Sequence, residues 1–280
     1  MTSALRRWQD QLAAWAIPPE ILGAVSDSPW ALPTRAFARR TDRYLAEPIG
    51  PSYARAAEAL SPRGTVLDVG AGSGAASLPL AARADRVTGL TAVDSSDEML
   101  GELTTRADRL EVPTTIVRGR WPDVADRVPP ADVVLCHHVF YNASDLAEFA
   151  VALHMHARRR VVVELTESHP LRVLNPLWLR LHGLDRPTGP TAADAEAVLR
   201  EVGIEPNREV WRRPGGSEYG SFDELVDVTV RRLCVPANRR PEVVDALLDL
   251  GVDRAHPMDL GSAGRELVTL WWDAPDLTLQ

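Results

Sequence analysis

Lysine is missing from this chain of 280 residues, so all 31 of its basic residues are arginine. We attribute this absence to genomic composition rather than to chemistry. Acidic residues number 39, and the formal net charge is −8. An acidic chain binds nucleic acid and anionic membranes poorly without a local basic groove. The composition therefore argues against nucleic acid as a partner, although it does not exclude such a groove.

Cysteine and long apolar runs are also scarce. The two cysteines, Cys136 and Cys234, lie far apart and make no disulfide framework. No apolar run approaches 18 residues, so no membrane segment is predicted. Polar residues at positions 9–11 stand where a secretory signal would need an apolar stretch. We therefore expect a cytoplasmic chain that forms one large domain or one domain with a cap.

The most informative stretch spans residues 65–82. It predicts a buried strand, a turn with alternating glycines, and a helix that begins near Ser73. Glycines allow the backbone to turn tightly and to approach a ligand. The free N–H groups at a helix start can bind that ligand. A turn without a ligand is disfavoured, because three glycines cost chain entropy and add no packing.

Two cofactor classes fit this turn. Gly70, Gly72 and Ala75 satisfy the G-x-G-x-x-G/A pattern of dinucleotide-binding proteins. Asp68, followed by Gly70, Gly72 and Gly74, satisfies the D-x-G-x-G-x-G pattern of S-adenosylmethionine (SAM) enzymes. Asp68 favours SAM, because a carboxylate repels a pyrophosphate but suits an ammonium and a sulfonium. A nicotinamide dinucleotide remains the alternative.

Asp94 closes the next expected strand, about 20 residues beyond the turn, where an acid can bind both ribose hydroxyls. The alternative role is to cap the following helix, which Ser95 and Ser96 can do as well. Met99 and Leu100 are placed either to line an apolar slot for adenine or to pack in the core.

Strands and helices alternate after residue 65, which predicts an α/β fold with a parallel sheet. The first 60 residues are helical and rich in aromatics, and form either a packed extension or a cap over the site. We predict a helical cap over 1–60, a cofactor-binding domain over 61–280, and a helical insertion over 214–264. Strands are expected at 65–69, 87–93, 114–117, 132–137, 160–165, 207–213 and 266–272, with helices near 73–84, 97–110, 145–157, 192–201, 222–234 and 241–250.

Three segments together resemble the motifs of class I SAM-dependent methyltransferases: 68–74, 92–100 and 131–138. The resemblance covers about residues 60–170. It implies a seven-stranded Rossmann-like sheet of order 3-2-1-4-5-7-6 with strand 7 antiparallel. Here that sheet would carry an N-terminal helical cap and a helical insertion between strands 6 and 7.

The same resemblance implies SAM as cofactor and S-adenosylhomocysteine (SAH) as product. Asp68 and Gly70 would hold the methionine end and Asp94 the ribose. Residues after strand three would flank the adenine, although Arg120 stands where the family often has an acid or an amide. The expected cofactor-binding residues are Asp68, Gly70, Ala71, Gly72, Asp94, Ser95, Met99, Gly119, Arg120, Trp121 and His137.

Reactive groups of this family usually meet the methyl at the end of strand four. His137, His138 and Tyr141 are therefore the candidate catalytic residues, as proton acceptors or as lining of the pocket. No Asn/Asp-Pro-Pro-Tyr/Phe or Pro-Cys motif follows that strand, which disfavours amino groups of bases and a cysteine adduct. His154 and His156 point apart on their helix, so no metal site is expected.

The resulting hypothesis is metal-independent methyl transfer to a small molecule by in-line displacement. Two alternatives stay open: methylation of RNA or protein, and a SAM-binding module without turnover. A contiguous arginine-lined groove would favour the first alternative, and a blocked substrate pocket the second.

Overall fold

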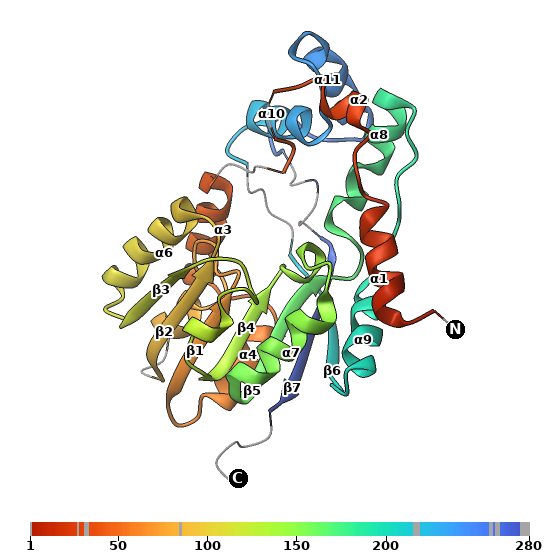
Figure 1. The fold of residues 1–280 in the computed structure, drawn as a ribbon. Coiled ribbons are helices and arrows are strands. Elements are labelled where there is room, and N and C mark those ends of the chain that lie inside the picture. The colour runs from red at the N-terminus through yellow and green to blue at the C-terminus, as the bar shows by residue number, and fades with distance from the viewer. Residues whose placement is uncertain are drawn as a thin grey trace.

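A mixed sheet of seven strands forms the centre of the computed structural model, in the order β3-β2-β1-β4-β5-β7-β6 (Figure 1). β7 pairs antiparallel with β5 and β6, and the other pairs are parallel. The predicted strand order and the antiparallel seventh strand are confirmed. The structure describes residues 2–26, 28–30, 34–83, 86–214, 219–257, 260 and 264–274. The strands are β1 (Gly64–Val69), β2 (Val87–Asp94), β3 (Thr114–Arg118), β4 (Ala131–His137), β5 (Ala157–Thr166), β6 (Asn207–Arg212) and β7 (Glu266–Asp273).

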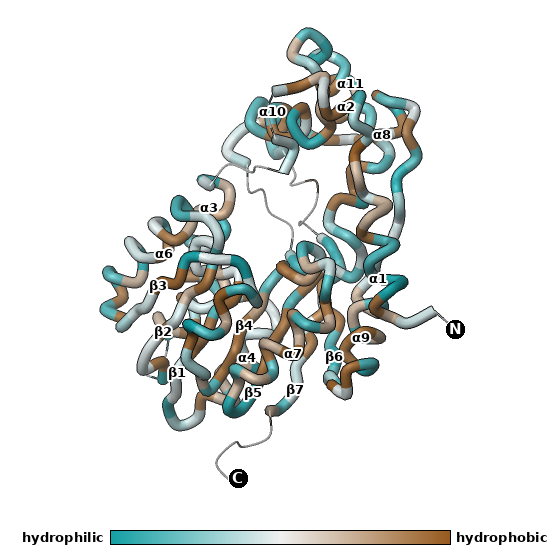
Figure 2. The backbone as a smooth tube through the Cα atoms, in the orientation of Figure 1, coloured by the Kyte–Doolittle hydropathy of each residue, from teal (hydrophilic) through white to brown (hydrophobic). Residues whose placement is uncertain are grey.

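Side chains along the strands alternate between two apolar cores, one on each face of the sheet. Leu67 and Val69 of β1 belong to one core and Val66 to the other. In Figure 2 β4 is predominantly hydrophobic, as expected for a strand that helices cover on both faces. The first core includes α1 (Ala4–Ala13), α7 (Leu146–His156) and α9 (Ala192–Glu201). The second includes α4 (Pro51–Ala59), α5 (Leu78–Arg83), α6 (Asp97–Arg109) and Tyr44 of α3 (Thr34–Ala46). Short 3-10 segments span Ala125–Arg127, Phe140–Asn142, Pro170–Leu174 and Ala237–Arg239.

Four further helices form a lobe with an apolar core of its own. They are α2 (Pro19–Leu22), α8 (Asn175–His182), α10 (Phe222–Arg232) and α11 (Arg240–Asp249). The lobe stands beyond the carboxyl ends of the parallel strands (Figure 1). The predicted insertion therefore shares the lobe with α8, which comes from the β5–β6 connection, and with α2. Residues 215–218, 258–259 and 261–263 of that insertion lie outside the described residues.

The N-terminal helices occupy three different places. α1 packs beside α9, and Trp8 Nε1 donates to Ala143 O at 2.8 Å. α2 joins the lobe, while α3 and α4 lie against the second core. The predicted division at residue 60 falls between α4 and β1. No helix in the described ranges is long and apolar enough to cross a membrane.

The helix predicted to begin at Ser73 is wrong in its start. α5 begins at Leu78, and the preceding residues form turns. Gly72 (φ +52°) and Gly74 (φ +92°) adopt left-handed backbone conformations that a continuous right-handed helix does not allow. The turn therefore presents a loop, rather than a helix start at Ser73, to whatever binds there.

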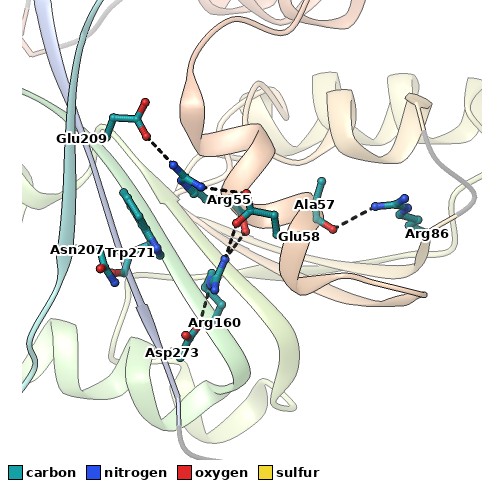
Figure 3. Close-up of polar contacts among 9 residues, drawn as sticks. All are labelled: Arg55, Ala57, Glu58, Arg86, Arg160, Asn207, Glu209, Trp271 and Asp273. Carbon is teal, nitrogen blue, oxygen red and sulfur yellow. Dashed lines mark hydrogen bonds and ion pairs between the residues drawn. The ribbon is translucent and has the colours of Figure 1, made fainter.

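Two arginines fasten α4 to the sheet (Figure 3). Arg160 of β5 donates to Arg55 O at 3.1 Å and forms ion pairs with Glu58 at 3.1 Å and Asp273 at 2.7 Å. Arg55 pairs with Glu209 of β6 at 3.0 Å, and its guanidinium lies 4.5 Å from the ring centroid of Trp271. These contacts join α4 to β5, β6 and β7, and so position the side chains that α4 directs toward the site described below.

Replacing Arg160 should loosen this attachment. We expect Arg160→Ala to lower the free energy of unfolding by about 1–2 kcal/mol. The substitution removes a mostly buried guanidinium, its hydrogen bond to Arg55 O and two partially screened ion pairs. Urea denaturation checks this. Arg158→Ala, on the same strand with an exposed side chain, is the matched control. Equal effects of the two substitutions would contradict the anchoring role.

Candidate active site

The glycine turn is fastened to the ends of β2 and β4. The N–H groups of Gly70 and Ala71 both donate to Val93 O, at 2.8 and 3.0 Å. A Cβ atom on Gly70 would lie 2.3 Å from Val139 Cγ2, so only glycine permits this approach to the segment after β4. Gly72 differs, because a Cβ there would meet nothing within 4 Å. The turn is therefore tightly packed at Gly70 and open at Gly72.

Asp94, at the end of β2, holds this turn directly. Its Oδ2 accepts from Gly72 N at 2.9 Å and its Oδ1 from Ser96 N at 2.9 Å. Ser96 is the residue that caps α6, by accepting from Met99 N, so Asp94 is not needed as the cap. A carboxylate offers about four lone-pair positions. Asp94 therefore keeps acceptor capacity for the hydroxyls of a ribose.

Asp68, two residues before Gly70, carries a carboxyl group in the protein interior. Its side chain is fully buried on β1, and neither oxygen has a hydrogen-bond partner of acceptable geometry in the described part of the chain. Burial raises its pKa to about 7; the nearby Ser77 hydroxyl opposes this increase, and Asp94 adds to it. A buried polar group without a partner is uncommon in folded proteins. The ammonium group of SAM would supply the missing partner, so this residue fits the predicted cofactor.

The three residues predicted to flank the adenine occupy different environments. Gly119 N donates to Asp94 O at 3.0 Å, which places it beside the ribose candidate. Arg120 is exposed. Trp121 is buried, and its Nε1 donates to Phe149 O at 3.3 Å. Its ring is therefore committed to packing against α7. Ser95 is exposed and Met99 half-buried at the start of α6. Cofactor contacts of these residues remain predictions.

A polar cluster lies at the carboxyl ends of β4 and β5. His138 adopts a left-handed conformation (φ +60°), and its N–H donates to Glu164 O at 2.6 Å. Its Nε2 lies 2.9 Å from Arg213 Nη2 and 3.3 Å from Glu164 Oε1. Arginine can only donate, so the neutral imidazole accepts at Nε2. Ser52 of α4 completes the cluster by donating to Glu164 Oε2 at 2.7 Å.

Burial and charge set the protonation of this cluster. Burial lowers the pKa of His138 to about 4; Glu164 opposes the shift, and Arg213 and Arg40 reinforce it. Burial also lowers the pKa of His137. For Glu164, burial opposes ionisation, but His137, His138 and Arg213 around it lower its pKa. At neutral pH the cluster therefore holds two uncharged imidazoles, one carboxylate and one guanidinium.

Two tyrosines from the N-terminal helices form an aromatic wall beside these groups. The Tyr53 hydroxyl donates to Ala75 O of the glycine turn at 2.7 Å, and its ring lies edge-on to His137 at 6.1 Å. Tyr44 packs edge-on against Tyr53 at 6.1 Å. The sequence pattern included Tyr44 and Tyr53 among the N-terminal aromatics that could line the site, but it did not place Ser52 or Arg213 there.

Tyr141 lies in a different environment from the two histidines. Its hydroxyl donates to Thr166 O at 2.7 Å, and its ring stacks on Trp8 at 5.6 Å and meets His169 edge-on at 5.3 Å. Burial raises its pKa well above the ordinary value. These contacts commit its proton to a backbone carbonyl, so the structure gives no support to Tyr141 as a base.

Other features of the molecule are separate from this site. A groove of about 840 Å³ between α4 and α5 includes Tyr53 but otherwise lies toward the amino ends of β1 and β2, at Pro62 and Arg86. Within the described ranges, no group of three or more His, Cys, Asp or Glu side chains is arranged to hold a metal.

Comparisons with known proteins agree with this geometry. Residues 66–159 match the family model of a methyltransferase domain. No curated protein sequence matches the chain. Similar solved structures include the YcgJ protein from Bacillus subtilis, with a TM-score of 0.52 and 16% identity over 80% of this chain and 98% of that one. The plantazolicin methyltransferase BamL, in complex with a triazolic desmethylPZN analogue and SAH, has a TM-score of 0.51 and 15% identity over 96% of this chain and 98% of that one. The plantazolicin methyltransferase BpumL, in complex with SAH, has a TM-score of 0.50 and 12% identity over 97% of each chain. At these identities the likeness shows the fold alone.

Removing the Asp94 carboxylate should weaken SAM binding. We expect Asp94→Ala to raise the Kd for SAM about tenfold or more, because it removes a charged acceptor for the ribose and releases Gly72. Calorimetric titration checks this. Asp97→Ala, three residues further on with an exposed carboxylate paired to Arg118, is the control. Unchanged affinity of the Asp94 variant would refute the ribose role.

Asp68 should release a proton when the cofactor binds. Its pKa of about 7 in the free protein means that it is largely protonated at about pH 6.5, and a bound ammonium favours the carboxylate. The affinity for SAH should therefore rise as the pH rises through 7. At about pH 6.5 the measured binding enthalpy should vary with the ionisation enthalpy of the buffer. Asp68→Asn should bind more weakly and lose this variation; an equal buffer dependence in both proteins would contradict the assignment.

Proposed function

Because the chain is a class I SAM-dependent methyltransferase, we propose that it methylates a small molecule held between the ends of β4 and β5 and the helical lobe. The cluster of half-buried His138 with buried Glu164 and Arg213, beside the glycine turn, carries this proposal. Polar groups collected inside a protein need partners of matching chemistry. A small acceptor enclosed there can supply them.

The surroundings of the cluster favour an enclosed acceptor over a polymer. α3 lies on the glycine turn, where the Thr41 and Ser73 hydroxyls share a hydrogen bond of 2.7 Å. α10 of the lobe is tied to α3, because Glu224 pairs with Arg35 at 2.7 Å and with Arg39. α3 is therefore joined both to the glycine turn and to the lobe. In this proposal α3 and the lobe cover an acceptor held at the carboxyl ends of β4 and β5. The net charge of −8 also disfavours an RNA substrate.

SAM supplies an activated methyl group, and the residues of this chain bind and orient it. Asp68 fits the ammonium, the open backbone at Gly72 fits a close approach of the ligand, and Asp94 fits the ribose. The protein's main contribution to an in-line displacement is alignment of the acceptor and exclusion of water. The lobe and the two tyrosines perform both tasks in this proposal.

His137 is the proton acceptor in this proposal. Its Nε2 is buried without a hydrogen-bond partner among the described residues. Its lowered pKa leaves the imidazole uncharged at neutral pH, so it can take a proton from a hydroxyl or an amine. His138 is less suited, because its Nε2 already accepts from Arg213. His138 therefore acts as a positioning residue for that guanidinium.

Two measurements test the function. SAM at saturating concentration should raise the Tm, because a ligand that binds only the folded state stabilises it. Labelled SAM, incubated with the protein and a low-molecular-weight cell extract, should yield a labelled small molecule. SAM binding with no transfer to this extract would contradict the small-molecule proposal. Transfer only to RNA or protein would favour a polymer substrate, and no transfer to any fraction a binding module.

Replacing His137 should slow transfer more than it weakens cofactor binding, because its predicted contact with the cofactor is one of several. We expect His137→Asn to reduce kcat by roughly 10²–10⁴-fold, and to raise the Kd for SAM by a much smaller factor. The native rate should fall as the pH drops through a pKa below the usual value for histidine, because protonation removes the acceptor lone pair. The variant should lose this dependence. His256→Asn, on an exposed side chain, is the control; an unchanged kcat at His137 would exclude its role.

A further inference from the structure

We infer that the methyl acceptor carries a carboxylate and that Arg213 binds it. This inference rests on the proposed function, since it concerns the acceptor side of the same site. Arg213 follows β6 directly, where the chain leaves the sheet for the lobe, and reaches the ends of β4 and β5. It would determine which acceptors bind, and is not itself a group that moves protons.

The guanidinium of Arg213 has donors to spare inside the protein. Only 7% of its side chain is exposed. Nη2 donates to His138 Nε2, whereas Nε is buried and has no partner among the described residues. A guanidinium carries five N–H donors, and leaving one unpaired in the interior costs free energy. A carboxylate that accepts from this group would remove that cost.

Arg213 has no carboxylate within hydrogen-bond distance among the described residues. Glu164 Oε1 lies 3.8 Å from Arg213 Nη2, beyond hydrogen-bond distance, while its Oε2 accepts from Ser52. Both histidines beside it are uncharged at neutral pH, because burial lowers their pKa values. A ligand carboxylate in hydrogen-bond contact would therefore give this buried guanidinium a closer anionic partner than Glu164.

The guanidinium is also held in one place before any ligand arrives. Its Cζ lies 5.6 Å from the ring centroid of Tyr44, a cation–π arrangement. The Arg213 N–H donates to Arg265 O and its carbonyl accepts from Gly264 N, each at 3.1 Å. His138, its side-chain acceptor, has the sparsely populated backbone conformation that often marks functional sites. A fixed planar fork suits bidentate recognition of a carboxylate.

A binding experiment separates this role from a purely structural one. The protein saturated with SAH is titrated with acetate, benzoate and indole-3-acetate, and with the corresponding neutral amides. We expect at least one carboxylate to raise the Tm beyond SAH alone, with its amide ineffective. In Arg213→Met the SAH-dependent increase in Tm should remain, while the affinity for that carboxylate falls about tenfold or more. Arg213→Lys, which keeps the charge without the fork, should bind it with intermediate affinity.

Arg212→Met is the matched control, because Arg212 precedes Arg213 but is exposed and paired with Glu266 at 3.0 Å. It should bind the carboxylates as the native protein does. The inference is overturned if none of the three carboxylates adds stability, if the amides bind equally well, or if Arg213→Met binds the carboxylate with native affinity. Loss of the SAH response in Arg213→Met would make Arg213 a structural residue, which also overturns it.

Transfer to fractionated extract gives an independent readout. A low-molecular-weight extract is separated on an anion exchanger before incubation with labelled SAM. We expect label only with the retained, anionic fraction, and Arg213→Met should raise the KM for that fraction more than it lowers kcat. Transfer only with the unretained fraction would overturn this inference and leave the proposed function intact. Transfer with no fraction would count against the proposed function itself.

Discussion

The hydrogen bond from Gly72 N–H to the Asp94 carboxylate connects the ends of the two strands that carry the cofactor candidates. It fixes the glycine turn while leaving the space beside Gly72 open. The other contacts of the turn depend on this position: Gly70 packs against Val139, and the carbonyl of Ala75 accepts from Tyr53. Tyr53 also packs edge-on against His137, so a displacement of the turn would move the ring that contacts this proposed proton acceptor.

The N-terminal helices serve as structural parts of the site. α3 reaches the turn through Thr41, and α4 reaches β5 through Ser52. α4 is in turn held against the sheet by ion pairs at its far side, around Arg160 (Figure 3). The lobe meets α3 through Glu224, so cofactor turn, acceptor cluster and lobe share one set of supports.

Buried ionisable groups determine which ligand charge suits the cofactor side and which suits the acceptor side of the site. Asp68 is buried, its oxygens have no hydrogen-bond partner of acceptable geometry among the described residues, and its pKa is raised, so it favours a cation. Arg213 is buried, its Nε has no partner among the same residues, and Glu164 Oε1 lies 3.8 Å from its Nη2, so it favours an anion. Each group costs free energy in the empty protein, and that cost is reduced when a ligand of opposite charge binds. The two ligands would then meet across the histidines at the end of β4.

The sequence by itself determined the alternation of strands and helices and the position of the glycine turn, because their signals are local: apolar strands separated by helices, an acid two residues before the first glycine, and Asp94 closing β2. The strand order was implied by the resemblance to class I SAM-dependent methyltransferases, and the structure confirms it. The sequence pattern placed the helix start wrongly, since left-handed φ angles at Gly72 and Gly74 are not visible in a pattern. Tyr141 stays a prediction, and its hydroxyl donates to Thr166 O. Only the tertiary structure decided the acceptor side. His138 and Arg213 are 75 residues apart, and Ser52 and Glu164 are 112 apart. Such contacts follow from how α4 and Arg213, directly after β6, pack against the ends of β4 and β5, which no stretch of neighbouring residues encodes.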